Sequence, residues 1–437
     1  MLAKNDTKFN VAVIGAGYVG LVVSACLAKL GNKVISVDNN RKKIELLKSM
    51  KIPNYEPGLE NLVRENVRRR KLEFSSDLKR AVRKSDIIFI AVGTPAKENG
   101  EADLSAVERV AFGISQVLDA YKLIVEKSTV PVRTGEKVKE TIRRYAKGDI
   151  EFDVASNPEF LREGRAISDF LRPDRIVIGV ESKRAASLLK ALYRPLKAPI
   201  VVTDINTAEL IKHASNSFLA TKISFINAVS MICEKTGANI EEVALGMGLD
   251  RRIGKEFLAA GIGWGGSCFP KDVDAFIHIA KKTGYNFRLL EEVRHVNIFQ
   301  RRHFLERIKE ELWILKGKNI AILGLAFKPN TDDLRESPAL YLINELLEEE
   351  AKLRVYDPQA MNKAKKFIRN VKFCRDSYEA VKGADCMILA TAWEEFKNLN
   401  FKKIKTLMRY PFVADGRNLY SSSQLGSLGF KYIGIGK

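Results

Sequence analysis

Three glycines in the spacing Gly-x-Gly-x-x-Gly, at Gly15, Gly17 and Gly20, restrict the fold of this chain more than any other feature. Residues 10–14 before them are apolar and predict a buried strand, and residues 21–30 predict a small-residue helix that a further glycine ends. In such a turn Gly15 permits the tight bend, Gly17 lets the backbone approach a pyrophosphate, and Gly20 packs helix on strand. The pattern predicts a Rossmann-like βαβ unit whose helix N-terminus faces phosphate.

An acidic residue, Asp38, ends the second predicted strand at residues 33–38. An acid at this place accepts hydrogen bonds from a ribose 2′-hydroxyl and repels a 2′-phosphate, so NAD is favoured over NADP. Thr94 and Thr129 follow two further apolar strands, and ligands bind at the carboxyl ends of parallel strands, so both are expected in the cofactor cleft. A βαβ unit with a purely structural glycine turn is the alternative.

The chain has 437 residues, which is more than one hydrophobic core usually holds. Asn206 and Glu209 form a capping pattern, and an apolar periodicity from there to residue 234 predicts one long helix. Its length suits a helix that spans domains or forms a dimer, and a core helix of one large domain is the alternative. Helical patterns continue to about residue 315.

Strands are predicted again at residues 319–323, 353–356 and 386–390, which implies a second Rossmann-like sheet. Residues 324–328 lack three spaced glycines, so this half is assigned to substrate rather than to a second NAD. The expected fold class is α/β, with two Rossmann-like doubly wound domains joined by a long central helix and a helical middle domain. The expected boundaries are 1–203 for the NAD-binding domain, 204–315 for the helical dimerisation domain, and 316–437 for the substrate domain.

A formal net charge of +20 raises the hypothesis of a nucleic-acid binder. The basic clusters at 41–43 and 68–71 are short, however, and lack the interleaved aromatic side chains that stack on bases. A solvated basic surface is therefore favoured, with no nucleic-acid partner. Such a charge would also steer anionic ligands toward their clefts.

The five cysteines are odd in number and form no Cys-x-x-Cys pair, which favours a reducing compartment and no metal site. Residues 1–10 are polar and show no secretion pattern. Residues 9–28 are uncharged and long enough to span a bilayer, but their glycine placement argues for the turn described above. A cytoplasmic protein without a membrane partner is expected.

Cys268 lies in a glycine-rich segment, residues 263–272, beside Lys271 and before a helix start expected after Pro270. Both neighbours would lower the pKa of a thiol and make it a better nucleophile. A buried structural cysteine in a glycine turn is the equal alternative.

Lys212 and Asn216 are spaced so that they share one helix face and could reach one oxyanion, although a solvated face is the more common meaning of such a pair. Glu159 and Glu163 follow a predicted strand at 152–156, where a carboxylate could act as a general base or simply lie at the surface.

The sequence resembles the UDP-glucose/GDP-mannose dehydrogenase family, with matching segments spread along the whole chain. These segments are residues 15–20, 55–58, 92–95, 126–131, 157–161, 209–216, 265–272, 324–328 and 415–418. The resemblance implies NAD-dependent oxidation of a nucleotide sugar at C6 to the carboxylate, through a thiohemiacetal and then a thioester on Cys268. The resemblance also implies that Lys212 and Asn216 stabilise the oxyanion and that Asp272 assists proton transfer. Glu159 and Thr129 would activate the hydrolytic water.

The resemblance also implies two sets of binding residues. NAD would contact Gly15, Gly17, Tyr18, Val19, Gly20, Asp38, Lys43, Thr94, Thr129, Glu163, Lys271 and Arg335. The UDP-sugar would contact Glu159, Phe160, Leu161, Lys212, Asn216, Arg252, Phe257, Gly261, Gly265, Lys328 and Arg417. Arg252 would reach across from the partner in a homodimer or dimer-based oligomer, and Arg251 beside it leaves that assignment open by one position.

Phe269 and Pro270 after the cysteine resemble the UDP-glucose branch of the family, and an N-acetylhexosamine enzyme would more often carry histidine in place of Ser267. Conversion of UDP-glucose to UDP-glucuronate is therefore expected. The alternatives are the same chemistry on GDP-mannose or a UDP-N-acetylhexosamine, a two-electron hydroxy-acid dehydrogenase that does not need Cys268, and a nucleotide-binding regulator without turnover.

Overall fold

The computed structural model describes residues 8–97 and 100–437, which form two compact units. The first unit comprises Met1–Ser215 and Asp274–Thr283, and the second comprises Asn216–Val273 and Gly284–Lys437. Residues 1–7 of the polar start lie outside the described residues. The three-domain boundaries at 203/204 and 315/316 stay a prediction.

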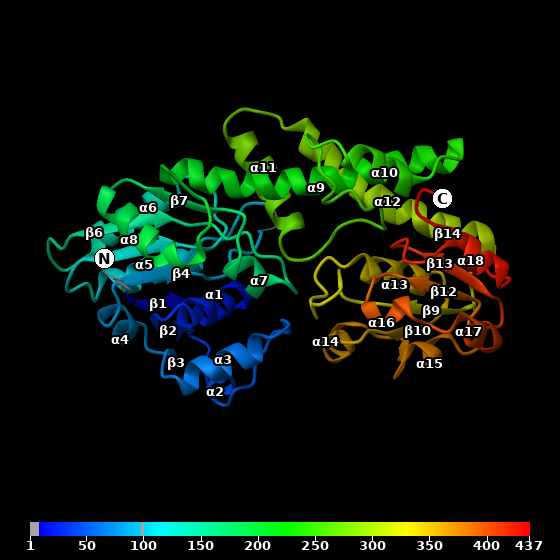
Figure 1. Ribbon diagram of the computed structural model, residues 1–437, viewed down its shortest axis with the longest axis horizontal. Coiled ribbons are helices and arrows are strands. Elements are labelled where there is room, and N and C mark those ends of the chain that lie inside the picture. The colour runs from blue at the N-terminus through cyan, green and yellow to red at the C-terminus, as the bar shows by residue number, and fades with distance from the viewer. Residues whose placement is uncertain (1–7, 98–99) are drawn as a thin grey trace, which may run out of the picture. The chain divides into compact units, whose positions relative to one another are not determined.

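An eight-stranded sheet forms the centre of the first unit (Figure 1). Its order is β3-β2-β1-β4-β5-β6-β7-β8, and its neighbours are parallel except β6 and β7. The chain runs outward from β1 to β3 and returns to β4 on the other side of β1, and ligands bind at such a reversal. The strands are β1 (Asn10–Ile14), β2 (Lys33–Val37), β3 (Leu72–Ser75), β4 (Ile87–Ile90), β5 (Lys122–Glu126), β6 (Phe152–Ser156), β7 (Ile176–Val180) and β8 (Ile200–Thr203).

Helices cover both faces of this sheet, and each face has its own apolar core. One core is formed with α1 (Tyr18–Lys29), α3 (Leu59–Arg68), α7 (Ala166–Leu171) and α8 (Lys183–Tyr193). The other is formed with α4 (Leu78–Arg83), α5 (Ser105–Ser115) and α6 (Thr134–Tyr145). The unit also contains α2 (Arg41–Lys48) and the short 3-10 helix η1 (Arg194–Leu196).

The predicted long helix is α9 (Ile205–Thr236), which runs from the first unit into the second. The predicted cap is wrong, because the helix begins one residue earlier and Asp204 caps it, accepting a hydrogen bond from the Thr207 backbone N–H over 2.8 Å. Asn206 donates to Glu136, and the Glu209 carboxylate accepts from the backbone N–H groups of Arg133 and Gly135. Asp204, two positions before Asn206, therefore caps the helix in place of the predicted pair.

A six-stranded parallel sheet with the order β11-β10-β9-β12-β13-β14 forms the core of the second unit. Its strands are β9 (Asn319–Leu323), β10 (Lys352–Tyr356), β11 (Val371–Phe373), β12 (Cys386–Leu389), β13 (Phe412–Asp415) and β14 (Lys431–Gly434). Its helices are α13 (Pro338–Glu348), α14 (Met361–Phe367), α15 (Ser377–Val381), α16 (Glu394–Lys397), α17 (Phe401–Leu407) and α18 (Ser422–Ser427). Two Rossmann-like domains with a helical middle region are thus confirmed.

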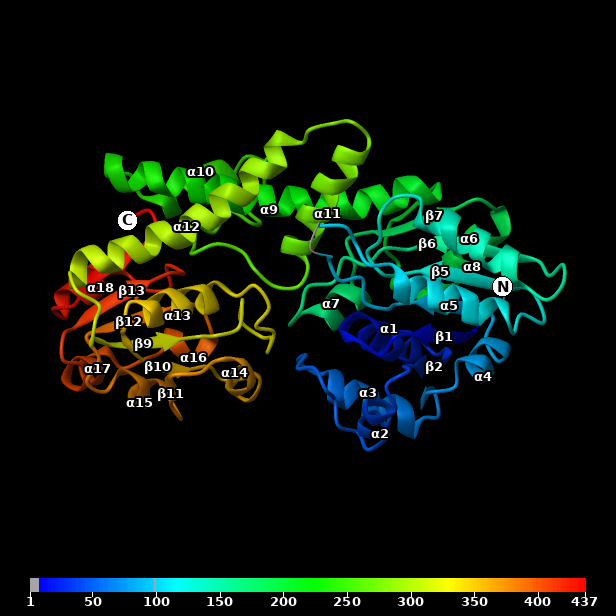
Figure 2. The same cartoon turned by 180° about the vertical axis from the view of Figure 1, so that it is seen from behind.

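The helical part of the second unit contains the end of α9, then α10 (Ile240–Gly248) and α12 (Arg288–Leu312), which lie side by side in Figures 1 and 2. Helix α11 (Phe269–Lys282) begins in this unit and ends in the first. No helix of the described residues is long and apolar enough to span a bilayer. The uncharged stretch at 9–28 forms β1, the glycine turn and most of α1.

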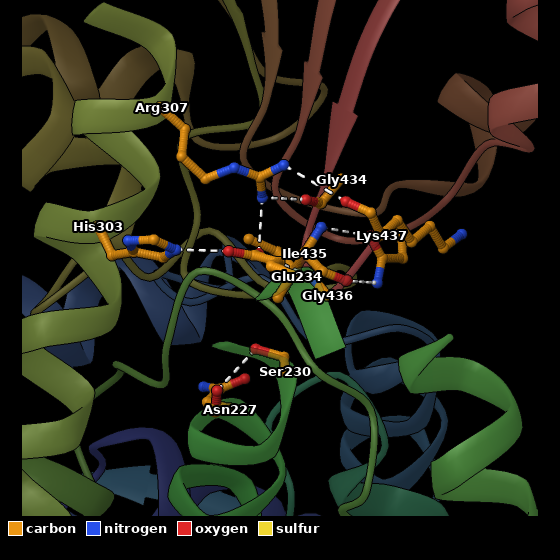
Figure 3. A network of polar contacts seen from close by, with 10 residues as sticks. Asn227, Ser230, Glu234, His303, Arg307, Gly434, Ile435, Gly436 and Lys437 are labelled. Atoms are coloured by element: carbon orange, nitrogen blue, oxygen red, sulfur yellow. Dashed lines mark hydrogen bonds and ion pairs between the residues drawn. The ribbon is translucent and has the colours of Figure 1, made fainter. Parts of the chain in front are cut away.

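The last residues of the chain are bonded to α9 and α12 through one carboxylate, Glu234 (Figure 3). Glu234 pairs with the Arg307 guanidinium over 2.6 Å and accepts from the Gly436 backbone N–H over 2.9 Å. His303 contacts its second oxygen, and Arg307 also donates to the Gly434 carbonyl. This network joins the strand β14 to the helical part of the second unit.

Candidate active site

The glycine turn of the first unit has room for a ligand at one position only. Gly15 has a φ of +105°, and a Cβ there would lie 2.4 Å from the Ala91 carbonyl oxygen. A Cβ at Gly20 would lie 1.8 Å from the Gly15 carbonyl oxygen, so a side chain is excluded there too. At Gly17 a Cβ would meet no described atom within 4 Å. The open position lies at the start of α1, where backbone N–H groups can face a pyrophosphate.

Asp38 follows β2 directly and is 9 % exposed. One of its oxygens accepts from the Ala16 backbone N–H over 3.0 Å, which places the carboxylate against the glycine turn. Lys43 on α2 pairs with the same oxygen over 2.7 Å. This arrangement fits the ribose end of NAD, because a carboxylate beside the turn accepts a 2′-hydroxyl.

The two predicted threonines lie together at the strand ends. The Thr94 hydroxyl donates to the Thr129 carbonyl over 2.8 Å, across the neighbouring strands β4 and β5. Thr94 is buried and Thr129 is partly exposed. Both therefore lie at the carboxyl edge of the sheet on the β4 side of the reversal.

Sequence reasoning gave no role to Glu56, which holds a second part of the predicted cofactor site. Its carboxylate accepts from the Tyr18 hydroxyl and from the backbone N–H groups of Gly164 (2.6 Å) and Ala166 (2.8 Å). Burial, and then the hydrogen bond to Glu56, raise the pKa of Tyr18, so the phenol stays neutral. Glu56 lies in the matching segment 55–58, and its glutamate between tyrosine and proline was the only available indication.

A buried ion pair joins Glu159 and Lys212, whose Oε1 and Nζ atoms are 3.0 Å apart. Their side chains are 6 % and 4 % exposed, so the solvated-face alternative for Lys212 is excluded. The other Glu159 oxygen accepts from the Leu161 backbone N–H over 2.6 Å, and the Lys212 ammonium lies 5.4 Å from the Phe160 ring centroid. The loop after β6 is thus held to α9 by charge.

Cys268 is the partly exposed cysteine of the described residues, whereas the other four are buried. Helix α11 begins at the next residue, and the Asp272 backbone N–H donates to the Cys268 carbonyl over 2.8 Å. Cys268 therefore occupies the N-cap position, where the helix N-terminus favours a thiolate. The Ser267 hydroxyl lies 3.6 Å from its sulfur.

Asp272, one turn into α11, is 1 % exposed and has a partner on each carboxylate oxygen. The Asn216 side-chain amide donates to one oxygen over 2.6 Å, and the Lys271 ammonium pairs with the other over 2.6 Å. Asn216 is 6 % exposed, so its helix face is enclosed as well. The second unit thus places Lys271 and Asp272 within one helix turn of Cys268, and Asn216 of α9 donates to that Asp272.

Trp264 anchors the loop that leads to Cys268. Its backbone N–H donates to the Asn297 side chain over 2.8 Å, and its carbonyl accepts from Asn297 (3.1 Å) and Arg301 (2.6 Å) of α12. Its indole N–H donates to the Ser224 hydroxyl of α9 over 3.0 Å. A Cβ at Gly265 would lie 2.0 Å from the Glu336 carbonyl oxygen, so the loop packs closely against the domain of the second sheet and leaves no room for a side chain at this position.

Arg417 follows β13 and lies under this loop. Its guanidinium donates to the carbonyls of Ala390 (2.8 Å) and Gly263 (3.2 Å), and a Cβ at Gly261 would lie 3.1 Å from its Nη1 atom. Burial, and then repulsion from Arg301, lower the pKa of Arg417 to about 10. Lys328 is beside Phe327, whose carbonyl also accepts from Arg417. The second unit therefore groups Arg417, Lys328 and the glycine loop.

The remaining predicted positions have various partners. The Arg335 carbonyl accepts from the Gly266 backbone N–H of the glycine loop over 2.9 Å, and the Phe257 ring centroid lies 6.3 Å from that of Phe269. Arg252 pairs with Asp250 and is 89 % exposed, and Arg335 pairs with Asp333 and is 65 % exposed. Arg335 and Lys271 belong to the second unit, whereas the remaining predicted NAD contacts, Glu163 and Val19 included, belong to the first. Phe257 is partly buried and has a φ of +66°.

The turn after β9 of the second sheet resembles the glycine turn after β1 of the first sheet, but a side chain occupies its acidic residue. Gly324 has a φ of +91° and donates to the last residue of β10, as Gly15 does to the last residue of β2. Asp357 accepts from the backbone N–H groups of Leu325 and Ala326, but the Trp393 indole also donates to it over 3.0 Å. A ribose hydroxyl is excluded there because Asp357 is 1 % exposed.

Three family models match the chain in order. The UDP-glucose/GDP-mannose dehydrogenase NAD binding domain matches residues 9–197, the central domain of that family matches 206–298, and its UDP binding domain matches 321–422. Among the described residues no cluster of side chains could hold a metal ion.

Named relatives resemble the chain over its whole length. The UDP-glucose 6-dehydrogenase TuaD of Bacillus subtilis is 48% identical over 98% of this chain and 93% of its own. The structure of a UDP-glucose dehydrogenase from Pyrobaculum islandicum has a TM-score of 0.93 at 38% identity, covering 100% of this chain and 99% of that one. A UDP-D-ManNAc dehydrogenase structure from Pyrococcus horikoshii has a TM-score of 0.86 at 30% identity, covering 98% and 99%.

Proposed function

Because the chain belongs to the UDP-glucose/GDP-mannose dehydrogenase family, we propose that it oxidises UDP-glucose to UDP-glucuronate with NAD. The similar protein from Bacillus subtilis and the similar structure from Pyrobaculum islandicum are both named for UDP-glucose, and they exceed the UDP-D-ManNAc structure in identity. The single observation that carries the chemistry is the accessible Cys268 at the N-terminus of α11, beside the Asn216–Asp272 pair.

The proposed reaction begins with a two-electron oxidation of the C6 alcohol to an aldehyde. NAD, which the glycine turn and Asp38 would hold, would supply the hydride acceptor for both oxidations of C6. The Cys268 thiolate adds to the aldehyde carbon, a C–S bond forms, and the carbonyl electron pair becomes an oxyanion. Lys212 and Asn216 stabilise this oxyanion, and Asp272 assists its protonation to the thiohemiacetal.

Oxidation of the thiohemiacetal removes a second hydride and a proton and leaves a thioester on Cys268. Water then adds to the thioester carbon, the C–S bond breaks, and the electron pair returns to sulfur as thiolate. Glu159 takes a proton from this water, and Thr129 positions it. The net reaction consumes one water and releases a carboxylate, so it is effectively irreversible.

Two cationic groups of the second unit are assigned to the nucleotide. Arg417 and Lys328 lie near the glycine loop, and guanidinium and ammonium groups bind diphosphate oxygens strongly. Backbone at Gly261 and Gly265, with Phe257, would line the sugar. The bound diphosphate would place negative charge beside Arg417, whose own hydrogen bonds go to carbonyls.

We also assign the chain to a homodimer formed through α9. Phe218, Phe225 and Ile232 are 65 %, 53 % and 60 % exposed and recur every seven residues, so they form one apolar stripe. A stripe with this spacing matches the packing of one helix against another. The exposed Arg252 of the same unit is assigned to the site of the partner. A cytoplasmic location suits the free thiols Cys26, Cys233, Cys374 and Cys386.

Counting NADH formed per mole of limiting UDP-glucose tests the function. About two NADH per sugar are expected, because the aldehyde is oxidised again on Cys268. Cys268→Ser should lose the second oxidation, while the matched control Cys374→Ser, a buried thiol in the second sheet's domain, should keep it. One NADH per sugar with an unaffected Cys268→Ser variant would identify a two-electron dehydrogenase. Turnover of UDP-ManNAc in place of UDP-glucose would change the substrate only.

A further inference from the structure

Lys127 is a buried cation next to the Glu159–Lys212 pair that the proposed mechanism does not use. It follows the last residue of β5 and is 5 % exposed. Its ammonium donates to the Asn157 side-chain oxygen over 2.9 Å, and the Tyr193 hydroxyl donates to the same oxygen over 2.6 Å. The Tyr193 ring centroid lies 5.9 Å from the ammonium. The ammonium thus donates to a neutral amide oxygen rather than to a carboxylate.

Asn157 connects Lys127 to the loop that carries Glu159. The asparagine lies two residues before Glu159 in the chain, and its amide nitrogen donates to the Val177 carbonyl of β7 over 2.7 Å. Its position is therefore fixed from two sides, by β7 and by Lys127. Glu159 in turn accepts from Lys212, so the three ionisable side chains form one buried cluster.

We propose that Lys127 is a positioning residue for the Glu159–Lys212 pair: it holds the Glu159 loop through Asn157, and its protonation sets the net charge of the buried cluster. The proposal rests on the proposed function for the role of Glu159. The charged and titratable groups that face Lys127 are Glu159 from the loop after β6, Lys212 from α9, and Tyr193 from α8.

The energetics explain why a lysine at this place is informative. Burial lowers the pKa of Lys127 to about 7, repulsion from Lys212 adds to the effect, and attraction to Glu159 opposes it. An uncharged side chain could also hold Asn157, so packing alone gives no reason to bury an amine. With Glu159 and Lys212 ionised, the cluster carries a net charge of +1 when Lys127 is protonated and of 0 when it is not. Near neutral pH, protonation of Lys127 thus changes the electrostatic potential at Glu159 and Lys212.

Two substitutions separate the charge from its titration. Lys127→Met keeps a long apolar stem without charge, and Lys127→Arg keeps a charge that does not titrate. The measurement is kcat/KM for NADH formation from UDP-glucose between about pH 5.5 and 9, because kcat/KM reports ionisations of the free enzyme. The native enzyme should show an inflection near pH 7 that both variants lack. Lys127→Met should match its high-pH plateau, and Lys127→Arg its low-pH plateau.

Tyr193→Phe is the matched control, since it removes the other hydrogen bond to Asn157 and no charge. It should retain the inflection. An inflection near pH 7 that persists unchanged in both Lys127 variants would overturn the proposal.

A second measurement, the pH dependence of thermal unfolding, does not depend on activity. It therefore tests the proposal even if UDP-glucose is not the substrate. A lowered pKa in the folded state means that the unfolded chain binds more protons between about pH 7 and 10, so stability rises with pH in that window. The midpoint of thermal unfolding of the native protein should therefore rise relative to Lys127→Met above pH 7. In a Glu159→Gln background this rise should begin at lower pH, because the attraction that favours the charged lysine is gone. A pH-independent difference, or one that Glu159→Gln does not move, would refute the charge coupling.

Discussion

The Asn216 amide donates a hydrogen bond of 2.6 Å to Asp272, and both side chains are at least nine-tenths enclosed. The bond joins α9 to the first turn of α11, directly after Cys268. Each Asp272 oxygen accepts from a different donor, one from the Asn216 amide and one from the Lys271 ammonium, so both oxygens are required as acceptors.

Asp272→Asn should therefore lower both activity and stability. The new amide would place a second donor against Asn216 or against Lys271, and a buried unsatisfied donor costs about 1–3 kcal/mol. The midpoint of thermal unfolding and the rate of NADH formation measure the two effects. Asp204→Asn is the control, because asparagine caps a helix as well as aspartate does. An Asp272→Asn variant as stable and active as the control would contradict the assignment.

Asn297→Ala should loosen the Cys268 loop without touching any proposed ligand. Three of the hydrogen bonds to Trp264 come from α12, and Asn297 makes two of them. We expect a lower kcat with a smaller change in KM for NAD, and a changed rate of alkylation of Cys268 by iodoacetamide. Gln300→Leu on the same helix is the control: Gln300 is fully buried, and neither of its side-chain polar atoms has a partner in the described residues, so stability should stay equal or rise. Equal alkylation rates in both variants would argue against the anchor.

Glu56→Gln should weaken NAD binding selectively. One amide oxygen cannot replace two carboxylate oxygens that accept from Tyr18, Gly164 and Ala166, so the segment next to Glu163 should lose its position. Loss of about 1.4 kcal/mol of binding free energy corresponds to a tenfold higher dissociation constant. Titration of NAD by calorimetry measures it. Tyr18→Phe, which leaves both backbone bonds to Glu56, should lose less; the reverse order would be inconsistent with the structure.

Glu126→Gln should stabilise the protein at alkaline pH and leave it unchanged in acid. Burial raises the pKa of Glu126 to about 8, and the nearby Glu209 adds to the rise. Since the folded state holds this proton more tightly than the unfolded chain does, the stability it contributes is present at low pH and is lost as pH rises from about 4.5 to 8. Unfolding by urea at pH 5 and pH 9 compares the two proteins. A variant that is stabilised equally at both values would show that Glu126 does not titrate in this range.

Phe225→Glu with Ile232→Glu should convert the proposed dimer to a monomer. Both side chains lie on the exposed stripe of α9, and a buried charge pair of like sign across an isologous interface would repel. Light scattering measures the mass. Leu46→Glu on α2, an exposed leucine of the first unit, is the control and should leave the mass unchanged. A native protein that is monomeric at all concentrations would remove the assignment of Arg252 to a partner.

Local patterns predicted the fold well because they act over short distances. The strands at residues 152–156 and 319–323 were predicted to the residue, since each is a short run ended by a break in the pattern. The cap predicted at Asn206 was wrong because the Glu209 carboxylate accepts from the backbone N–H groups of Arg133 and Gly135 at the start of α6, not from its own helix.

The site residues were harder to predict, because their meaning depends on partners that are distant in sequence. Spacing alone gave Lys212 an exposed helix face, and the pairing with Glu159, more than 50 residues away, reverses that expectation. Glu56 and Lys127 received no role because no local rule marks a buried charge whose partners lie on other elements. The resemblance implied which residues form the site, and the structure shows which side chains and backbone groups hold several of them in place.

The closed turn of the second sheet limits the number of NAD molecules that the chain can bind at one time. The turn after β1 is open at Gly17, whereas at the matching turn after β9 the Trp393 indole donates to Asp357. The proposed reaction removes four electrons from one carbon. With one such site, NADH has to leave and a second NAD has to bind midway through each turnover. In the proposed mechanism the covalent bond to Cys268 therefore also keeps the half-oxidised sugar on the protein while NADH leaves and a second NAD binds.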